Sequence, residues 1–164
     1  GLGADVGTVE FFLSSDSETS SMSPEWSDAV SSRLPDHQWN ETRSVEITTL
    51  DALIAEYGLP DFCKVDVEGF ELDVLRGLST PLPALSFEYT PERLEPAFAC
   101  IERLQALGDY EFQLSRAVDF AFDDESWLTA TAVGERLAAE RGSDRSGDVY
   151  ARLRSTATDE APPP

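Results

Sequence analysis

The sequence contains little of what nucleic-acid-binding and lipid-binding proteins need. It has one lysine, Lys64, and eleven arginines against 32 acidic residues, so the formal net charge of its 164 residues is -20. Binding to phosphate groups depends on clustered lysine and arginine. We therefore expect neither a nucleic-acid partner nor a membrane surface. The acidic excess suits a high-salt cytoplasm, where ions screen self-repulsion, and an arginine-biased, GC-rich genome explains the scarcity of lysine equally well.

Cysteine, histidine and long apolar runs are also scarce. Cys63 and Cys100 fit neither a metal-ligand spacing nor a disulfide framework, and the sequence predicts two buried thiols in a reducing compartment. His37 has no cysteine or histidine at ligand spacing, which favours a surface histidine over a catalytic one. No apolar run approaches the roughly 20 residues of a membrane span, and no signal-peptide pattern is present. These features predict a soluble, cytoplasmic protein.

What the chain does contain is enough apolar sequence for one domain. Hydrophobic residues make up 41% of it and aromatic residues 10%, which favours folding over disorder. We predict a domain over residues 1–155 and a loose tail over residues 156–164. Residues 14–44 hold ten serines and read as a long surface loop insertion. Its Trp26 and Trp39 indicate either a lid that faces a substrate or anchors that hold the loop on the core.

The remaining sequence predicts alternating strands and helices, because its apolar spacing changes between a period of two and a helical period. Predicted strands cover residues 8–13, 45–48, 61–67, 84–90, 110–116 and 147–154, and predicted helices cover residues 50–57, 69–78, 91–107 and 126–141. The near-continuous apolar run in residues 61–67 is typical of a parallel sheet. We therefore predict an α/β fold with a largely parallel, right-handed crossover sheet.

Charged residues lie where one of these strands ends, in the stretch "KVDVEGFE". Ligands of open α/β sheets collect at the carboxyl ends of strands, and Gly69 permits a sharp turn or a close approach to a ligand. Strand alternation places Lys64 and Asp66 on one face, where they can form a salt bridge. Burying the two charges is costly unless they pair or are used. The position of Asp66 nearer the strand end favours a functional role for it, whereas Lys64 reads more as its structural partner.

Two further carboxylates leave alternatives open. Glu71 falls inside the apolar arc of the helix that follows the strand. It either reaches back to the amide of Glu68 in a capping box or joins Asp66 and Glu68 in an acidic cluster that accepts a proton or holds a cation. Glu88, at the end of the next strand, either extends this cluster or caps the helix after it.

Residues 48–89 resemble the signature of the FkbM family of S-adenosylmethionine-dependent methyltransferases. The matching features are Thr-Leu-Asp before a helix, "KVDVEG" with Glu71 two residues later, a Leu-Arg-Gly helix end and a strand that closes with glutamate. The opening residues 1–14 also resemble the segment after the family's third core strand. The resemblance covers residues 1 to about 90, and the rest only by its strand-helix rhythm. It implies a partial class I methyltransferase (Rossmann-like) sheet, mostly parallel, with a closing antiparallel strand pair.

The resemblance implies O-methylation of a hydroxyl, often on a sugar or natural-product scaffold. Asp66 would orient the acceptor hydroxyl or the methionine end of S-adenosylmethionine, Glu68 and Glu71 would act as base or as cation ligands, and Lys64 would be the electrostatic partner of Asp66. The family's glycine-rich cofactor loop and ribose-binding acid have no counterpart, so the chain reads as the C-terminal part of a methyltransferase domain. We expect these residues alone to bind the cofactor poorly or not at all, and tight binding measured by calorimetry would refute this expectation.

Two other functions compete with this reading. A metal-assisted hydrolase would use the acidic cluster at the strand end to hold Mg²⁺. An inactive or partner-dependent fragment would need no catalytic residue at all.

Overall fold

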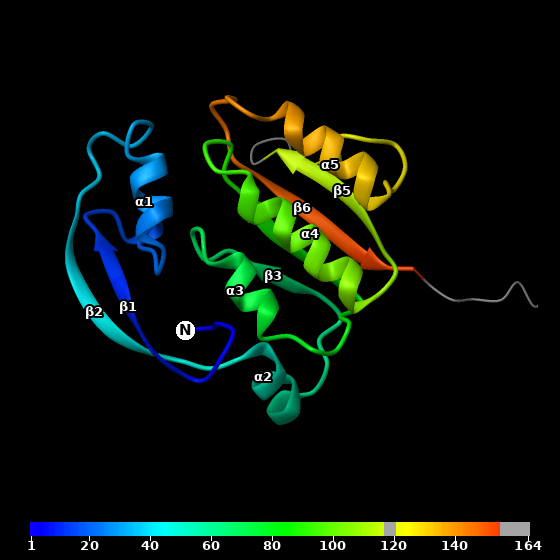
Figure 1. Ribbon diagram of the computed structural model, residues 1–164, viewed down its shortest axis with the longest axis horizontal. Helices are drawn as coiled ribbons and strands as arrows, with labels where there is room; N and C mark the ends of the chain where they lie inside the picture. The colour runs from blue at the N-terminus through cyan, green and yellow to red at the C-terminus, as the bar shows by residue number, and fades with distance from the viewer. Residues whose placement is uncertain (117–120, 155–164) are drawn as a thin grey trace, which may run out of the picture.

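The computed structural model describes residues 1–116 and 121–154, which form two separate sheets (Figure 1). The first is an antiparallel hairpin of β1 (Gly7–Ser14) and β2 (Trp39–Ile47), which we call the N-terminal hairpin. The second has four strands in the order β3 (Cys63–Val65), β4 (Ala84–Tyr89), β6 (Gly147–Leu153) and β5 (Tyr110–Arg116). Strands and helices alternate along the chain, as the sequence predicts.

The expected largely parallel sheet is wrong. Only β3 and β4 pair in parallel, while β6 runs antiparallel to both of its neighbours. The reason is the order of the strands. β3, β4 and β5 run in the same direction, but β6 runs in the opposite direction and lies between β4 and β5. Each of these two strands therefore has an antiparallel neighbour in β6. The closing antiparallel pair of β5 and β6 agrees with the prediction. The sheet is therefore mixed.

Five α-helices connect these strands within the described residues. They are α1 (Pro24–Val30), α2 (Leu50–Tyr57), α3 (Glu71–Arg76), α4 (Glu95–Leu107) and α5 (Ala130–Ala139). The last three are shorter than predicted because local turns precede them: Thr90 and Arg93 form a bridge before α4, and Thr129 caps α5 by accepting from the amide of Ala132. None of these helices is long and apolar enough to cross a bilayer.

The serine-rich residues 14–44 contain regular structure rather than the predicted loop. They include a 3₁₀ helix (Ser17–Thr19), all of α1 and the first two thirds of β2, residues 39–44. Ser23 caps α1 by accepting from the amide of Trp26, and Pro24 follows at the first helical position. β2 begins at Trp39 because β1 supplies a partner along that whole length. Serine content alone therefore hid a capped helix and a paired strand.

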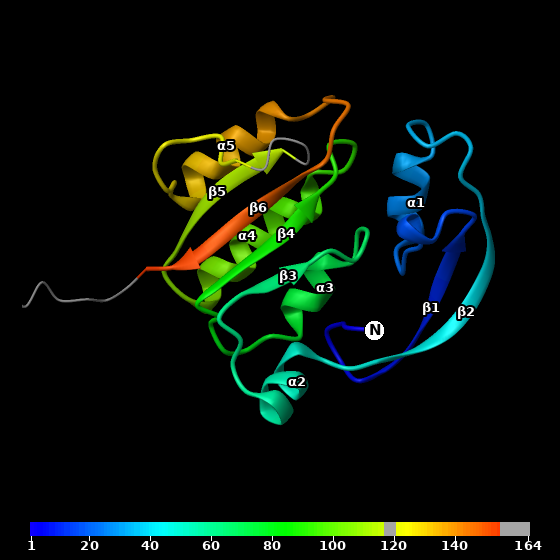
Figure 2. The same cartoon turned by 180° about the vertical axis from the view of Figure 1, so that it is seen from behind.

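Alternation divides the four-stranded sheet into an apolar and a polar face. Helices α3 and α4 cover one face, and Figure 2 shows the sheet from the other side. The buried cross-strand rows of the covered face are made of Cys63, Leu85, Ala151 and Phe112, then Val65, Phe87, Val149 and Leu114. The opposite face carries the polar rows Lys64, Ser86, Tyr150 and Gln113, then Glu88, Asp148 and Ser115. The polar rows end at the carboxyl end of β4, which positions the site.

The two cysteines and the histidine lie outside the site described below. Both cysteines are free thiols: Cys100 is buried in α4, as predicted, whereas Cys63 in β3 is only half-buried. Burial raises the pKa of both thiols. His37 lies beside the N-terminal hairpin with Nδ1 3.0 Å from Thr19 Oγ1, and its side chain is 22% exposed.

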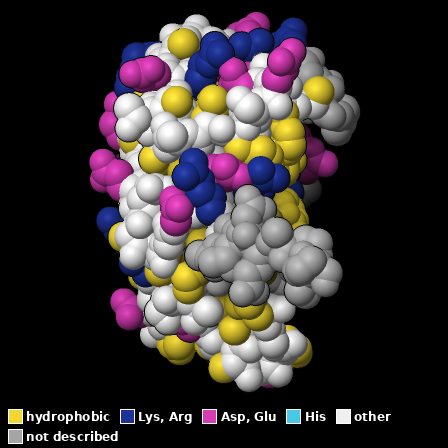
Figure 3. All heavy atoms as spheres, turned by 90° about the vertical axis from the view of Figure 1, so that its right-hand side faces the viewer, with side chains coloured by type: hydrophobic (Ala, Val, Ile, Leu, Met, Phe, Trp, Pro, Cys, Tyr) yellow, Lys and Arg dark blue, Asp and Glu magenta, His cyan; other side chains and the backbone are white. Residues whose placement is uncertain are grey.

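Acidic and basic side chains are interspersed on the side of the molecule shown in Figure 3. Arg152 and Arg154 both lie beside Glu111, with nitrogen–oxygen distances of 2.5 and 3.5 Å. Half-exposed ion pairs of this kind contribute only about 0–1 kcal/mol each. They nevertheless place the few arginines where they offset the repulsion of a chain with a net charge of -20.

Candidate active site

The chain turns sharply through residues 66–69, between β3 and α3, and we call this segment the strand-end turn. Glu68 has φ 53° and Gly69 has φ 90°, both in the left-handed region. Glycine adopts this conformation freely, whereas a glutamate there carries strain on the order of 1–2 kcal/mol. A strained non-glycine residue persists only where its surroundings hold it, and such residues concentrate at functional sites.

Glu71 holds the turn from behind. Its Oε1 accepts hydrogen bonds from the amides of Val67 at 3.3 Å and Gly69 at 3.1 Å, and the residue is 5% exposed. Burial raises its pKa, although these hydrogen bonds act in the opposite direction. The sequence suggested a bond to the amide of Glu68, but the left-handed backbone of Glu68 and Gly69 presents the amides on either side instead. Glu71 therefore stabilises the loop and does not belong to the group of converging carboxylates.

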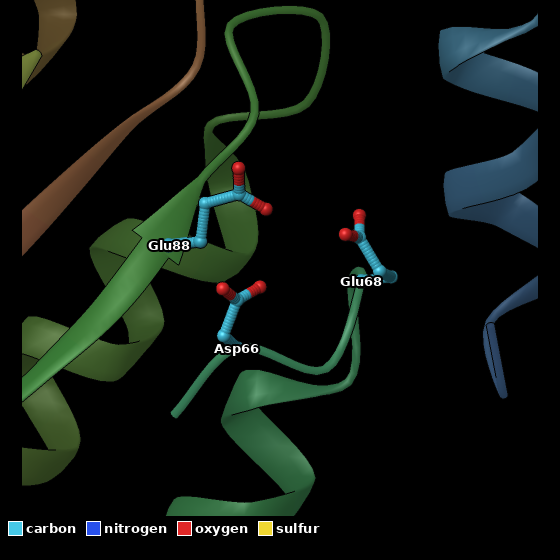
Figure 4. A group of neighbouring side chains, drawn as sticks. All are labelled: Asp66, Glu68 and Glu88. Carbon is cyan, nitrogen blue, oxygen red and sulfur yellow. The ribbon is translucent and has the colours of Figure 1, made fainter. Parts of the chain in front are cut away.

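Three other carboxylates converge, and we call them the carboxylate cluster. Asp66 and Glu68 come from the strand-end turn and Glu88 from the end of β4, and their side chains point toward one another (Figure 4). One oxygen from each lies within 4.8 Å of the others. Of the alternatives that the sequence left open for Glu88, the structure selects extension of the cluster.

Burial and mutual repulsion change the protonation of this cluster. The pKa of Glu68 is raised to about 7, first by burial and then by the charges of Asp66 and Glu71. The pKa of Glu88 is raised to about 8, first by burial and then by the charges of Glu68 and Asp66. Groups whose pKa lies near neutrality can both accept and release protons under ordinary conditions. The cluster therefore has the protonation behaviour of a general acid–base site.

Lys64 is the cationic neighbour of the cluster. Its Nζ lies 3.1 Å from Asp66 Oδ2 and 3.6 Å from Asp148 Oδ1, so the predicted Lys64–Asp66 salt bridge is confirmed. Burial alone would lower the pKa of Lys64, but the hydrogen bond to Asp66 and the charge of Asp148 raise it. The Lys64 and Asp66 side chains are 51% and 44% exposed. The expected cost of a buried pair is therefore small, because β3 lies at the edge of the sheet and the pair faces its polar side.

Two cavities share Asp66 in their linings. The sheet cavity, of about 540 Å³, lies over the polar face and is lined by Lys64, Asp66, Glu88, Arg116, Asp148 and Tyr150, among others. The hairpin cavity, also of about 540 Å³, lies toward the N-terminal hairpin and is lined by Phe11, Glu18, Ser20, Met22, Asp66 and Glu68, with Val67. Asp66 is the one cluster member that lines both.

Sequence reasoning missed the part of the sheet cavity that comes from β5 and β6. Arg116, Asp148 and Tyr150 line the cavity because β6 pairs with β4. This pairing places Asp148 directly opposite Glu88. Nothing in the local sequence around these residues signals a site. The resemblance predicted that residues 147–154 pair with residues 110–116, but it did not place them next to residues 84–89.

The carboxylate cluster fits cationic ligands. Carboxylate oxygens at this spacing suit a divalent cation such as Mg²⁺ or Ca²⁺. The same negative charge suits an organic cation, because attraction between opposite charges is strong where water is partly excluded.

Comparison with known families adds an independent finding. The family model described as the methyltransferase FkbM domain matches residues 1–114. The matched range contains the whole carboxylate cluster, Lys64 and Glu71, and ends before Arg116 and Asp148. No curated protein and no solved structure matches the chain.

Proposed function

Because this chain belongs to the FkbM methyltransferase family and is therefore a methyltransferase, we propose that it methylates a hydroxyl group of a small sugar-like or natural-product-like molecule with S-adenosylmethionine as the donor. The proposal goes beyond family membership in naming the donor, the acceptor group and the residues that act. Its main support is the position of Asp66 between the two cavities.

Methyl transfer requires two ligands to meet at one point with the acceptor oxygen in line with the bond that breaks. Asp66 lines both the sheet cavity and the hairpin cavity. An acceptor in one cavity and a donor in the other would therefore approach each other at this carboxylate. We assign the sheet cavity to the acceptor, because it carries Glu88 and Lys64 beside Asp66.

S-adenosylmethionine would supply a methyl group from its positively charged sulfur: the carbon–sulfur bond would break, and its electron pair would remain on the neutral thioether that leaves. Asp66 and Glu68 line the hairpin cavity and fit a cation, so they would hold the charged methionine end of the cofactor. The acceptor hydroxyl donates a hydrogen bond to Asp66. On transfer, the proton of this hydroxyl would pass to the carboxylate cluster, where the pKa of Glu68 is raised to about 7 and that of Glu88 to about 8.

Lys64 and Glu71 act through other residues. Lys64 offsets the negative charge beside Asp66, and Glu71 keeps the strand-end turn in its left-handed shape. The composition of the sheet cavity supports a polyhydroxylated acceptor: its carboxylates and Lys64 can bond hydroxyl groups, while the Tyr150 ring offers a flat apolar surface.

The test, made in a complete protein, is transfer of a labelled methyl group from S-adenosylmethionine to a panel of sugars and hydroxylated natural products. We expect Asp66→Asn to lower kcat by about 100-fold or more, the usual size of a lost acid–base or orienting group, while circular dichroism shows a folded protein. Asp73→Asn is the matched control, because Asp73 pairs with Arg76 on α3 and lies outside both cavities. Near-normal turnover of a folded Asp66→Asn variant would refute the proposal.

A second candidate function is metal-assisted hydrolysis. It is supported by the three carboxylate oxygens within 4.8 Å of one another, a donor set that Mg²⁺ accepts. Phosphoester hydrolysis assayed with Mg²⁺, and with EDTA as the control, separates it from methyl transfer. Family membership favours the methyltransferase.

A further inference from the structure

The two strands that carry the carboxylate cluster separate before they reach it. β3 pairs with β4 only from Cys63 and Leu85 to Val65 and Phe87. Asp66 and Glu68 follow the last paired residue of β3, and Glu88 follows its partner on β4. The hydrogen bonds between β3 and β4 therefore do not set the separation of the Glu68 and Glu88 carboxylates, and another contact must do so.

Trp26 makes that contact on both sides. It is 3% exposed, and its Nε1 donates a hydrogen bond of 2.9 Å to Oγ1 of Thr90, two residues after Glu88. Its Cβ, Cγ and Cδ1 lie directly against Gly69, where a Cβ added to the glycine would overlap them. One rigid indole thus joins the strand-end turn to the end of β4.

Two serines near Trp26 also connect the serine-rich segment to the strand-end turn and to the segment after β4. Ser21 Oγ donates to the carbonyl of Glu68 at 2.5 Å, on the side of the turn. Ser23 Oγ accepts from Arg93 Nη1 at 3.3 Å, on the side of β4. Trp26 follows both serines in the sequence and, unlike either of them, contacts both sides itself.

We propose that Trp26 is a positioning residue of the methyltransferase, and that its bond to Thr90 and its contact with Gly69 set the spacing of the Glu68 and Glu88 carboxylates. This inference rests on the proposed function of the carboxylate cluster. It also assigns a role to the serine-rich segment: the segment fixes the geometry of the site in addition to lining the hairpin cavity. A shift of about 1 Å in a catalytic group can change a rate by about 100-fold.

The direction of the Trp26 bond separates positioning from simple packing. Packing alone needs apolar volume, which phenylalanine would largely supply, whereas positioning needs the indole N–H and the Thr90 hydroxyl. Thr90→Val keeps the shape of the side chain and removes the acceptor oxygen, and Thr90→Ser keeps the oxygen. Trp39→Phe is the matched control, because Trp39 lies edge-on to Trp26 and also donates a hydrogen bond, but to Thr19 rather than to β4.

The first measurement is steady-state methyl transfer by the full chain and its variants. We expect Trp26→Phe and Thr90→Val to lower kcat about 10-fold or more with the KM for S-adenosylmethionine changed by less than about 3-fold, as for a loss of transition-state geometry. Thr90→Ser should recover most of kcat, and Trp39→Phe should match the original chain. Unchanged kcat in both Trp26→Phe and Thr90→Val would overturn the inference, as would equal losses in Thr90→Val and Thr90→Ser.

The second measurement needs no acceptor. The amide of Gly69, which donates to Glu71 Oε1, reports on the turn through its hydrogen-exchange rate measured by NMR. We expect faster exchange at Gly69 in Thr90→Val and Trp26→Phe but not in Trp39→Phe. If the complete protein methylates no acceptor, the proposed function fails while this measurement still decides the inference: unchanged exchange in both variants overturns it. If Trp26→Phe does not fold, Thr90→Val carries both measurements.

Discussion

The N-terminal hairpin has far fewer buried residues than the four-stranded sheet. No residue of β1 is fully buried and Ile47 is the only one in β2, whereas most residues of β4 and β5 are buried. An isolated two-stranded hairpin is at best marginally stable in water. The hairpin region therefore depends on its contacts with the rest of the molecule.

Those contacts lie next to the carboxylate cluster. The fully buried residues of the region between the two hairpin strands include Ser21, Ser23, Trp26 and Val30, and three of them touch the strand-end turn or the segment after β4. The sheet is thus stable through its own core, while the hairpin region is held by the residues that shape the carboxylate cluster. A change in the sheet core should act on stability, and a change at the junction should act on both stability and catalysis.

The largest contrast should come from core truncations in the two regions. Leu85→Ala removes a fully buried side chain from β4, and we expect it to cost about 2–5 kcal/mol of unfolding free energy. Phe12→Ala in half-buried β1 should cost about 1 kcal/mol, because little apolar area returns to water. Urea denaturation followed by circular dichroism measures both. Equal costs would show that the hairpin has a core of its own.

The next largest effect is expected where the two regions meet. Gly69→Ala places a Cβ against Trp26 and forces alanine to a φ of 90°, so we expect a loss of about 2–4 kcal/mol. Gly134→Ala is the control: Gly134 lies inside α5 with open space around it, and alanine should stabilise that helix by about 0.5–1 kcal/mol. If both substitutions act alike on the urea midpoint, the turn is not clamped by Trp26.

A smaller effect should depend on pH. The pKa of Glu88 is raised from 4.5 to about 8 in the folded protein, so the folded state binds more protons than the unfolded state between these values. Its stability contribution is present below pH 4.5 and is lost as the pH rises through 8. Glu88→Gln, which cannot ionise, should therefore be more stable than the original chain by about 1–2 kcal/mol at pH 9 and similar to it at pH 4.

The partners of Glu88 sharpen this prediction. The negative charges that raise its pKa after burial come from Glu68, Asp66, Glu71 and Asp148. Asp66→Asn removes one of them and should lower the pKa of Glu88, which moves the loss of stability to lower pH. Thermal unfolding between pH 4 and pH 9 measures both variants. A Glu88→Gln advantage that does not grow with pH would contradict the assignment.

The smallest effect should come from the outer surface of the hairpin. Arg43 and Glu41 form an ion pair of 3.0 Å with side chains 66% and 62% exposed. Arg43→Ala should change the unfolding free energy by less than about 0.5 kcal/mol, because water and salt screen such pairs. A larger change in the urea midpoint would show that this strand contributes more to the fold than its exposure indicates.

Local patterns predicted the parts of the site that lie close together in sequence. Strand alternation placed Lys64 and Asp66 on one face, and Gly69 marked a turn that the structure makes with positive φ. The helical arc of Glu71 indicated a buried carboxylate, which it is. Its partners could not be predicted, because they depend on two consecutive left-handed residues that a helical wheel does not include.

The serine-rich segment shows the opposite case. Its composition indicated a loop, since serine and isolated tryptophan give no apolar period. The capping serine and Pro24 were local signals for α1, but the burial of Trp26 against Gly69 arises between residues more than forty positions apart. Of the two alternatives for its tryptophans, anchoring describes Trp26, which is 3% exposed.

The sequence by itself determined the alternation of strands and helices, the charged turn after residues 61–67 and the Lys64–Asp66 pair, because each depends on spacing over a few residues. The tertiary structure alone decided that β6 enters between β4 and β5, that Glu88 joins Asp66 and Glu68, and that Trp26 links the two strand ends. These features depend on which distant segments pack side by side. Periodicity states which face of a strand is buried, but the competition among long-range packings chooses its neighbour.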